Sequence, residues 1–264
     1  LVFSILGYAP VLDHWGWHVT YTSNFSQAFI EGDYGHSRHL WSLCVEEQFY
    51  LFWPFIVIFT PRRHLPRVIV CLILGAVLYR FGGSLAGLDW KQATRPLLGC
   101  VDSLGFGALL AVYWCDPDKY AKQSALLLRL SLWLGLPLLV GTQTLYALSP
   151  SPRGLTVYVA LVDLSSSLFF VYLLHNAAMN KQHLFGRLLA LSPVRYVGKI
   201  SYGIYLYHFF LIDVLWSLST RLNVQIPTGW PYFLVHVAAT ILVAAVSWHV
   251  IEKPINNLKN RIPY

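Results

Sequence analysis

Residues 41–50 read Trp41-Ser-Leu-Cys-Val-Glu46-Glu47-Gln-Phe-Tyr50, and they open into the apolar run Leu51-Phe-Trp-Pro-Phe-Ile-Val-Ile-Phe59. Two adjacent carboxylates at the head of an apolar run are costly unless they are paired, hydrated or used, so they predict a functional site. On a helix, Ser42, Glu46 and Tyr50 share one stripe, while Glu47 points about a hundred degrees away. The pattern therefore predicts that one acid faces a cavity and the other a neighbouring helix or the headgroup zone.

The composition around this stretch indicates a membrane protein. The 264 residues are 56% hydrophobic and only 12% charged, with a mean hydropathy of +0.53. Soluble domains carry about 25% charged residues, roughly twice this share. The 10 Trp and 16 Tyr are typical of aromatic side chains at a membrane interface. We therefore expect an all-α, polytopic transmembrane helical bundle whose main partner is the lipid bilayer.

The hydrophobic pattern predicts seven full spans and one partial span. The full spans are expected at residues 40–60, 68–83, 96–114, 127–147, 155–175, 201–220 and 231–251. A shorter apolar stretch, Leu1 to about Leu12, lacks a basic flank and does not resemble a signal peptide. The span pattern therefore predicts that residues 1–264 form a single domain that lacks its N-terminal helices.

The basic residues predict the orientation of these spans. If alternate connections lie on one side, thirteen of the 19 Lys and Arg residues fall together and six fall opposite. The larger group is Arg62, Arg63, Arg67, Lys119, Lys122, Arg129, Lys181, Arg187, Arg195, Lys199, Lys253, Lys259 and Arg261. Because basic loops stay inside, this group and the C-terminus are expected in the cytoplasm, and the protein in the inner (plasma) membrane. The dispersal of the basic residues over several loops argues against a nucleic-acid partner.

No metal site or bound cofactor is predicted. The four cysteines lie in or beside the spans without a C-x-x-C pair, and buried free thiols are the interpretation that fits them. The sequence contains no Gly-rich phosphate loop, no G-x-S-x-G elbow and no H-E-x-x-H pattern.

Further polar residues inside apolar runs are candidate site residues. Arg95 precedes Asp102 by seven residues, about two helical turns, so they either pair structurally or form a site for an anionic or hydroxylated ligand. Asp163 is interpreted as an inter-helix hydrogen-bond partner. His208 shares a helical stripe with Ser201 and Tyr205; such a histidine is either a satisfied core donor or a general base.

Four segments together resemble the acyltransferase-3 family of integral membrane acyltransferases. The first is Trp41-Ser-Leu-x-x-Glu46-Glu47-Gln-Phe-Tyr50-Leu-x-Trp53-Pro54. The others, in the same order, are Arg95 through Asp102 to Gly107, Val197-Gly-Lys-Ile-Ser201-Tyr202-x-x-Tyr205-Leu-x-His208, and Glu252-Lys-Pro254. The resemblance covers essentially the whole chain, although the spacing in the second segment is looser than the family pattern.

The resemblance implies a parent protein of about ten transmembrane helices and an O-acyl transfer reaction. The expected co-substrate is acyl-CoA reached from the cytoplasm, with acetyl-CoA the favoured form, and the acceptor is a carbohydrate or lipid-linked sugar of the cell envelope. Family members also carry a catalytic histidine in a first helix and an arginine motif, and neither has a counterpart in these 264 residues. The expected catalytic residues here are Glu46, Glu47 and His208, with Glu46 the favoured partner of the base.

The same resemblance suggests substrate-binding residues. These are Trp41, Ser42, Tyr50, Arg95, Asp102, Ser201, Tyr202 and Tyr205. A rival interpretation is a transporter or flippase of an envelope intermediate, because intramembrane acids and histidines also suit proton coupling. A third is an inactive or scaffolding chain. Dependence on an acyl-CoA donor separates the enzyme from the transporter, and an upstream reading frame would exclude the inactive or scaffolding chain.

Overall fold

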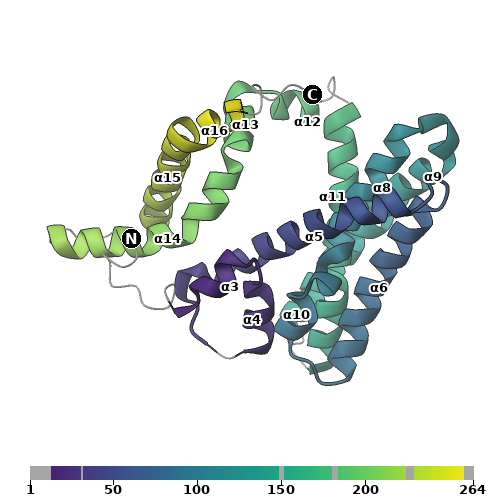
Figure 1. Ribbon diagram of the computed structural model, residues 1–264, viewed down its shortest axis with the longest axis horizontal. Coiled ribbons are helices and arrows are strands. Elements are labelled where there is room, and N and C mark those ends of the chain that lie inside the picture. Colours follow the sequence, from purple (N-terminus) through teal and green to yellow (C-terminus); the bar gives the residue numbers. More distant parts are fainter. Residues whose placement is uncertain (1–12, 31, 149–151, 180–183, 224–228, 259–264) are drawn as a thin grey trace. The chain divides into compact units, whose positions relative to one another are not determined.

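The computed structural model describes residues 13–258 apart from residues 31, 149–151, 180–183 and 224–228. Every regular element in the described residues is a helix, so the all-α prediction is confirmed (Figure 1). The predicted partial span, Leu1 to about Leu12, lies outside the described residues.

Each of the seven predicted spans coincides with a helix or a continuous run of helices, and six of these segments are long and apolar enough to cross a membrane. The six are Ser37–Phe59, Leu65–Leu85, Trp90–Cys115, Pro117–Leu148, Leu155–Met179 and Trp230–Leu258. The seventh predicted span is α14 (Ser201–Leu222), which has 22 residues but is more polar, because it contains His208, Asp213 and Arg221. The chain is a multi-pass membrane protein.

The chain divides into two compact units, which are described separately. Unit 1 comprises Leu1–Asp33 and Leu40–Lys181, and unit 2 comprises Tyr34–His39 and Gln182–Tyr264. The assignment of residues 1–264 to one functional domain remains a prediction.

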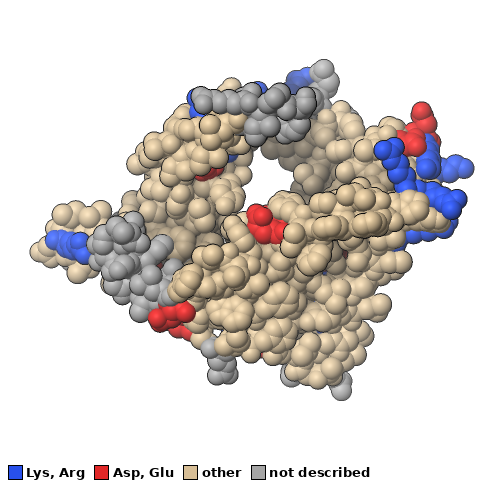
Figure 2. Space-filling model, viewed as in Figure 1, with Lys and Arg blue, Asp and Glu red and all other residues tan. Residues whose placement is uncertain are grey.

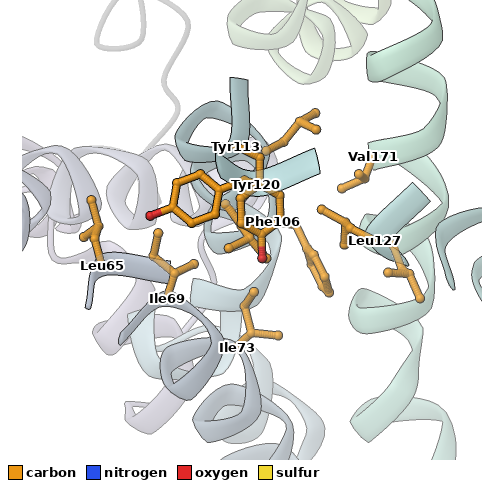
Figure 3. Packing of buried hydrophobic residues seen from close by; sticks show 11 residues of the cluster. Leu65, Ile69, Ile73, Phe106, Tyr113, Tyr120, Leu127 and Val171 are labelled. Atoms are coloured by element: carbon orange, nitrogen blue, oxygen red, sulfur yellow. The ribbon is translucent and has the colours of Figure 1, made fainter. Parts of the chain in front are cut away.

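Unit 1 is built around two helices, α6 and α8, with α11 against both. Its helices are α3 (Trp15–Val19), α4 (Ser23–Phe29), α5 (Trp41–Phe59), α6 (Leu65–Leu85), α7 (Trp90–Thr94), α8 (Leu97–Cys115), α9 (Pro117–Leu130), the π-helical turn η2 (Ser131–Gly135), α10 (Leu136–Leu148) and α11 (Pro152–Met179). The buried apolar cluster at its centre joins Leu65, Ile69 and Ile73 of α6 to Phe106 and Tyr113 of α8 and to Tyr120, Leu127 and Val171 (Figure 3).

Local sequence signals set where these helices begin. Asp89 caps α7 by accepting hydrogen bonds from the backbone N–H groups of Lys91 and Gln92, and Gln92 returns a bond to the Asp89 backbone N–H. Pro96, with an extended backbone (ψ 148°), separates α7 from α8. At the start of α9, Asp116 accepts a hydrogen bond from the backbone N–H of Lys119, and Pro117 is the first helical residue. These breaks fix the direction in which each following helix presents its polar residues.

Unit 2 contains all but the last residue of the 3₁₀ turn η1 (Gly35–Leu40), together with helices from the C-terminal part. They are α12 (Leu184–Leu189), α13 (Ser192–Lys199), α14 (Ser201–Leu222), α15 (Trp230–Ser247), the π-helical turn η3 (Trp248–Glu252) and α16 (Lys253–Leu258). The helices α14 and α15 pack together, and a Cβ placed on Gly203 would lie 3.2 Å from the Cβ of Ala244. The Tyr207 hydroxyl and Ser247 Oγ lie 3.0 Å apart across this contact.

Close packing of η2 against α11 yields a test of the fold. A Cβ added at Gly135 would lie 2.8 Å from the backbone nitrogen of Phe169, and backbone cannot give way easily. We expect Gly135→Ala to lower the free energy of unfolding by about 1–3 kcal/mol, measured by denaturant titration in detergent micelles. The matched control is Gly141→Ala, where nothing lies within 4 Å of the added Cβ. Equal stability of the two variants would contradict the close helix contact.

Candidate functional site

The signature residues at the N-terminal end of α5 line a small cavity within unit 1. The cavity has a volume of about 190 Å³ and lies between α5, α8 and α11. Its lining residues are Trp41, Ser42, Val45, Glu46, Cys100, Ser103, Leu104 and Asp163. The structure thus brings together three of the predicted residues, Trp41, Ser42 and Glu46, and adds a second carboxylate, Asp163, from α11. We call this the Glu46 cavity.

The second acid of the signature faces a different space. Glu47 and Tyr50 line a cavity of about 700 Å³, together with Gln48 and with residues from the α3–α4 region such as Thr20. The two acids therefore face different spaces, but both line a cavity, whereas the sequence predicted a cavity for only one of them. Tyr50 was expected on the stripe of Ser42 and Glu46, but it lines the cavity of Glu47. A stripe at i, i+4, i+8 turns by about 40° at each step, and two steps carry Tyr50 toward Glu47.

A buried ion pair lies on the helices behind the Glu46 cavity. Arg80 of α6 donates to both carboxylate oxygens of Asp102 of α8, at 3.0 Å (Nη1–Oδ1) and 2.6 Å (Nη2–Oδ2), and neither side chain is exposed (0% for each). Arg80 also donates to the backbone carbonyls of Gly99 and Ala160. Its Nη1 lies 4.0 Å from Oδ2 of Asp163, whose side chain is 38% exposed. The guanidinium therefore joins three helices through two carboxylates.

Structural pairing, one of the two alternatives predicted for Arg95 and Asp102, is wrong, because Asp102 pairs with Arg80. Arg95 donates through Nη1 to the side-chain and backbone oxygens of Gln27, at 2.8 and 3.2 Å. Its guanidinium also lies over the rings of Trp41 and Trp90, at 5.7 and 5.3 Å from their centroids. The expectation assumed one continuous helix from residue 95 to residue 102, whereas Pro96 ends that continuity and changes the direction of the side chain. Arg95 thus supports Trp41 at the edge of the Glu46 cavity.

A reciprocal amide pair fixes the signature helix to α4. Gln48 Nε2 donates to Asn24 Oδ1 at 2.8 Å, and Asn24 Nδ2 donates to Gln48 Oε1 at 3.2 Å. Gln48 Nε2 also donates to the backbone carbonyl of Tyr21, and Asn24 Nδ2 to that of Arg95. Asn24 is fully buried, so each of its amide atoms depends on these partners.

This pair makes a testable prediction about folding. We expect Gln48→Leu and Asn24→Leu each to lower the free energy of unfolding by about 1–3 kcal/mol. Gln48→Leu removes the side-chain partner of the buried Asn24 amide, and Asn24→Leu removes that of the partly buried Gln48 amide. The double variant should cost less than the sum of the two single variants. Denaturant titration of the four proteins in one detergent gives the coupling energy. Strict additivity would show that the two amides do not depend on each other.

In unit 2, His208 lies in a cluster of rings and backbone carbonyls. Its Nδ1 is 2.6 Å from the carbonyl oxygen of Tyr205, and a carbonyl only accepts, so Nδ1 carries the proton and Nε2 is the basic nitrogen of the neutral ring. The ring of His39 lies 5.0 Å from that of His208, and the Tyr205 hydroxyl donates to the His39 carbonyl at 2.5 Å. His236 Nε2 donates to the His208 carbonyl at 2.7 Å. Both interpretations of His208 fit this geometry.

The remaining predicted residues of unit 2 have simpler surroundings. Ser201 is exposed, and its hydroxyl donates to the backbone carbonyl of Gly198 at the start of α14. Tyr202 is exposed, at 51%. Tyr205 holds the His39 segment, as described above.

Two residues of the site escaped the sequence interpretation. Arg80 was not among the candidate site residues, although it lies inside the apolar segment Leu65–Leu85, where a charge is unusual and points to a functional or paired residue. Asp163 was interpreted only as an inter-helix partner; it does approach Arg80, but it also lines the Glu46 cavity. In the described part of the chain, no group of three or more His, Cys, Asp or Glu residues could hold a metal ion.

The family of this chain is shown by its sequence match to a family model. The sequence matches the family described as "Acyltransferase domain", the acyltransferase-3 family, over residues 1–250. The chain belongs to this family. The resemblance drawn from the four sequence segments is therefore confirmed.

Several curated relatives of this acyltransferase-family chain are similar at 28% identity. YrhL of Bacillus subtilis (strain 168), whose name assigns it to peptidoglycan O-acetylation, aligns with 92% of the chain and 38% of its own length. The O-acetyltransferase OatA of Staphylococcus aureus (strain NCTC 8325 / PS 47) aligns with 83% of the chain and 36% of its own length. The peptidoglycan O-acetyltransferase OatA of Listeria monocytogenes aligns with 83% and 35%. The chain thus spans less than two fifths of these relatives, and no solved structure matches it.

Proposed function

We propose that the protein is a membrane-bound O-acyltransferase that moves an acyl group, acetyl in the favoured case, from acyl-CoA to a hydroxyl group of a cell-envelope carbohydrate. Membership of the acyltransferase family supports the reaction class. The names of the relatives support peptidoglycan or a related glycan as the acceptor. In this proposal residues 1–264 belong to one acyltransferase domain in the inner membrane, with the C-terminus in the cytoplasm.

The observation that carries the proposal is the Glu46 cavity. It combines an indole (Trp41), two carboxylates (Glu46 and Asp163) and two hydroxyls (Ser42 and Ser103) in about 190 Å³. A sugar ring has apolar faces that pack on an aromatic side chain and hydroxyls that donate to carboxylates. The cavity therefore suits part of a sugar, held so that one hydroxyl approaches Glu46.

The reaction needs a group that takes a proton from this hydroxyl. The hydroxyl oxygen attacks the thioester carbonyl, a C–O bond forms, the C–S bond breaks, and the thiolate of CoA leaves and takes up a proton. Glu46 serves either as the base or as the carboxylate that orients a histidine base, and this acid–base part contributes on the order of 100- to 10,000-fold. His208, with Nε2 basic, is the second choice for the base, and Glu47 is a weaker candidate because it lines the other cavity.

The other predicted residues have supporting roles in this proposal. Trp41 and Ser42 contact the acceptor directly, and Arg95 supports Trp41 through its cation–π contact. Asp102 acts through Arg80, which lies close to Asp163. Tyr50 lines the cavity of Glu47. Ser201 and Tyr205 stabilise the helix that carries His208, and Tyr202 lies exposed on the same helix.

The experiment that tests the proposal measures transfer of label from acetyl-CoA to envelope carbohydrate. The protein is expressed from its complete native reading frame and, in parallel, as these 264 residues, and isolated membranes receive labelled acetyl-CoA. Base-labile label on glycan that depends on the protein is the expected result. Label incorporated by the 264 residues alone would place the base among them and make His208 the leading candidate. Failure of every form, with label retained only as acetyl-CoA, would overturn the donor or the acceptor and bring the transporter forward.

A further inference from the structure

A third cavity lies near the opposite end of α5 from Glu46, within unit 1. Its volume is about 660 Å³, and its wall is apolar, with Trp53, Val57 and Ile58 from α5 and Val112 from α8. Between Glu46 and Ile58 the helix rises by about 18 Å at 1.5 Å per residue, so this cavity is distinct from the candidate acceptor site. None of the residues assigned above to the acyl transfer lines it.

The rim of this cavity is basic. Arg62 and Lys119 are exposed and line it, and Arg63, Arg67 and Lys122 lie close by in the sequence. Figure 2 shows a dense group of Lys and Arg side chains at this end of unit 1, near α9. None of these five cations forms an ion pair with a described residue. The one acid on the rim, Asp116, caps α9 by accepting from the Lys119 backbone N–H. The ammonium group of Lys119 lies over the ring of Tyr120, 5.0 Å from its centroid, and both residues line the cavity.

We propose that this cavity binds an anionic phospholipid, with the phosphate between Arg62 and Lys119 and an acyl chain along the apolar wall. Phosphate suits two cations at the edge of a membrane span, and the cytoplasmic leaflet, where the charge pattern places this end, is rich in anionic lipid. The side chains of Val57 and Ile58 are 41% and 73% exposed, so the wall is open to hydrocarbon. A water-soluble phosphate compound with a polar arm would find few hydrogen-bond partners on this wall.

The test compares lipid binding to the purified protein in detergent. Native mass spectrometry measures the affinity for phosphatidylglycerol and for phosphatidylcholine with the same acyl chains. We expect a preference for phosphatidylglycerol that falls by about fivefold for each cation removed in Arg62→Gln and Lys119→Gln, and that survives in Arg62→Lys. The matched control is Arg129→Gln, an exposed arginine of α9 that does not line the cavity. An unchanged preference in the double variant, or an equal loss in the control, would overturn the proposal.

Occupancy of the cavity itself is read from Trp53. Phosphatidylglycerol with brominated acyl chains should quench part of the tryptophan fluorescence, and Trp53→Phe should remove that part. Pyrophosphate is the water-soluble phosphate compound with which lipid binding is compared. If millimolar pyrophosphate leaves the quenching unchanged, the lipid assignment stands. If pyrophosphate binds through Arg62 and Lys119 while brominated lipid fails to quench Trp53, the site belongs to a soluble phosphate ligand and the lipid assignment fails.

Discussion

Glu46→Gln is expected to abolish acyl transfer, by at least about 100-fold, while the protein remains folded. The substitution keeps the shape of the side chain and removes its ability to take a proton or to stabilise a protonated histidine. Glu46 is exposed and forms no ion pair with a described residue, so the loss of charge should hardly change stability. Label transfer from acetyl-CoA in membranes gives the rate, and the yield of purified protein reports folding.

Two companion variants make this result specific. Asp118→Asn changes an exposed carboxylate on α9 that lies outside both cavities of the signature helix, and it should keep wild-type activity. Glu47→Gln tests the competing acid. Full activity of Glu46→Gln together with an inactive Glu47→Gln would move the reaction to the 700 Å³ cavity and disprove the assignment of Glu46.

The sequence was most informative where structure depends on neighbours along the chain. Apolar runs predicted the spans because hydrophobicity is a local property, and the i, i+4 rule placed Ser42 and Glu46 in one cavity. The same rule failed for Arg95 and Asp102, although the reason, Pro96, was visible in the sequence. A helical phase cannot be carried across a residue that has no backbone N–H and starts a new helix.

Contacts between residues on different helices could not be predicted from the sequence. Arg80 and Asp102 are 22 residues apart and lie on different helices, and no spacing rule connects them. The reciprocal bonds of Asn24 and Gln48, and the approach of Asp163 to Arg80, likewise depend on how helices pack. The sequence did show an arginine inside an apolar span. Such an arginine is costly without a partner, but the sequence does not identify that partner.

That cost underlies the second prediction with a large effect. Arg80→Met is expected to lower the free energy of unfolding by about 3–5 kcal/mol, because it leaves the carboxylate of Asp102 buried without its cation. Arg80→Lys should restore only part of the loss, since an ammonium group cannot bind both oxygens of Asp102 while also donating to the carbonyls of Gly99 and Ala160. Unfolding in a mixed-micelle titration measures both, with Arg129→Met, an exposed arginine, as the control.

The double variant Arg80→Met/Asp102→Leu separates folding from function. With both charges removed, an apolar contact replaces the ion pair and most of the stability should return. In this variant Asp163 itself is not substituted and still lines the Glu46 cavity, but it loses the guanidinium that lies 4.0 Å from its carboxylate. If Arg80 acts only in folding, the double variant will transfer acetyl groups normally. If Arg80 also positions Asp163 for the acceptor, the stable double variant will show a raised KM for acceptor, and Arg80→Lys, which keeps a positive charge near Asp163, will show a smaller increase.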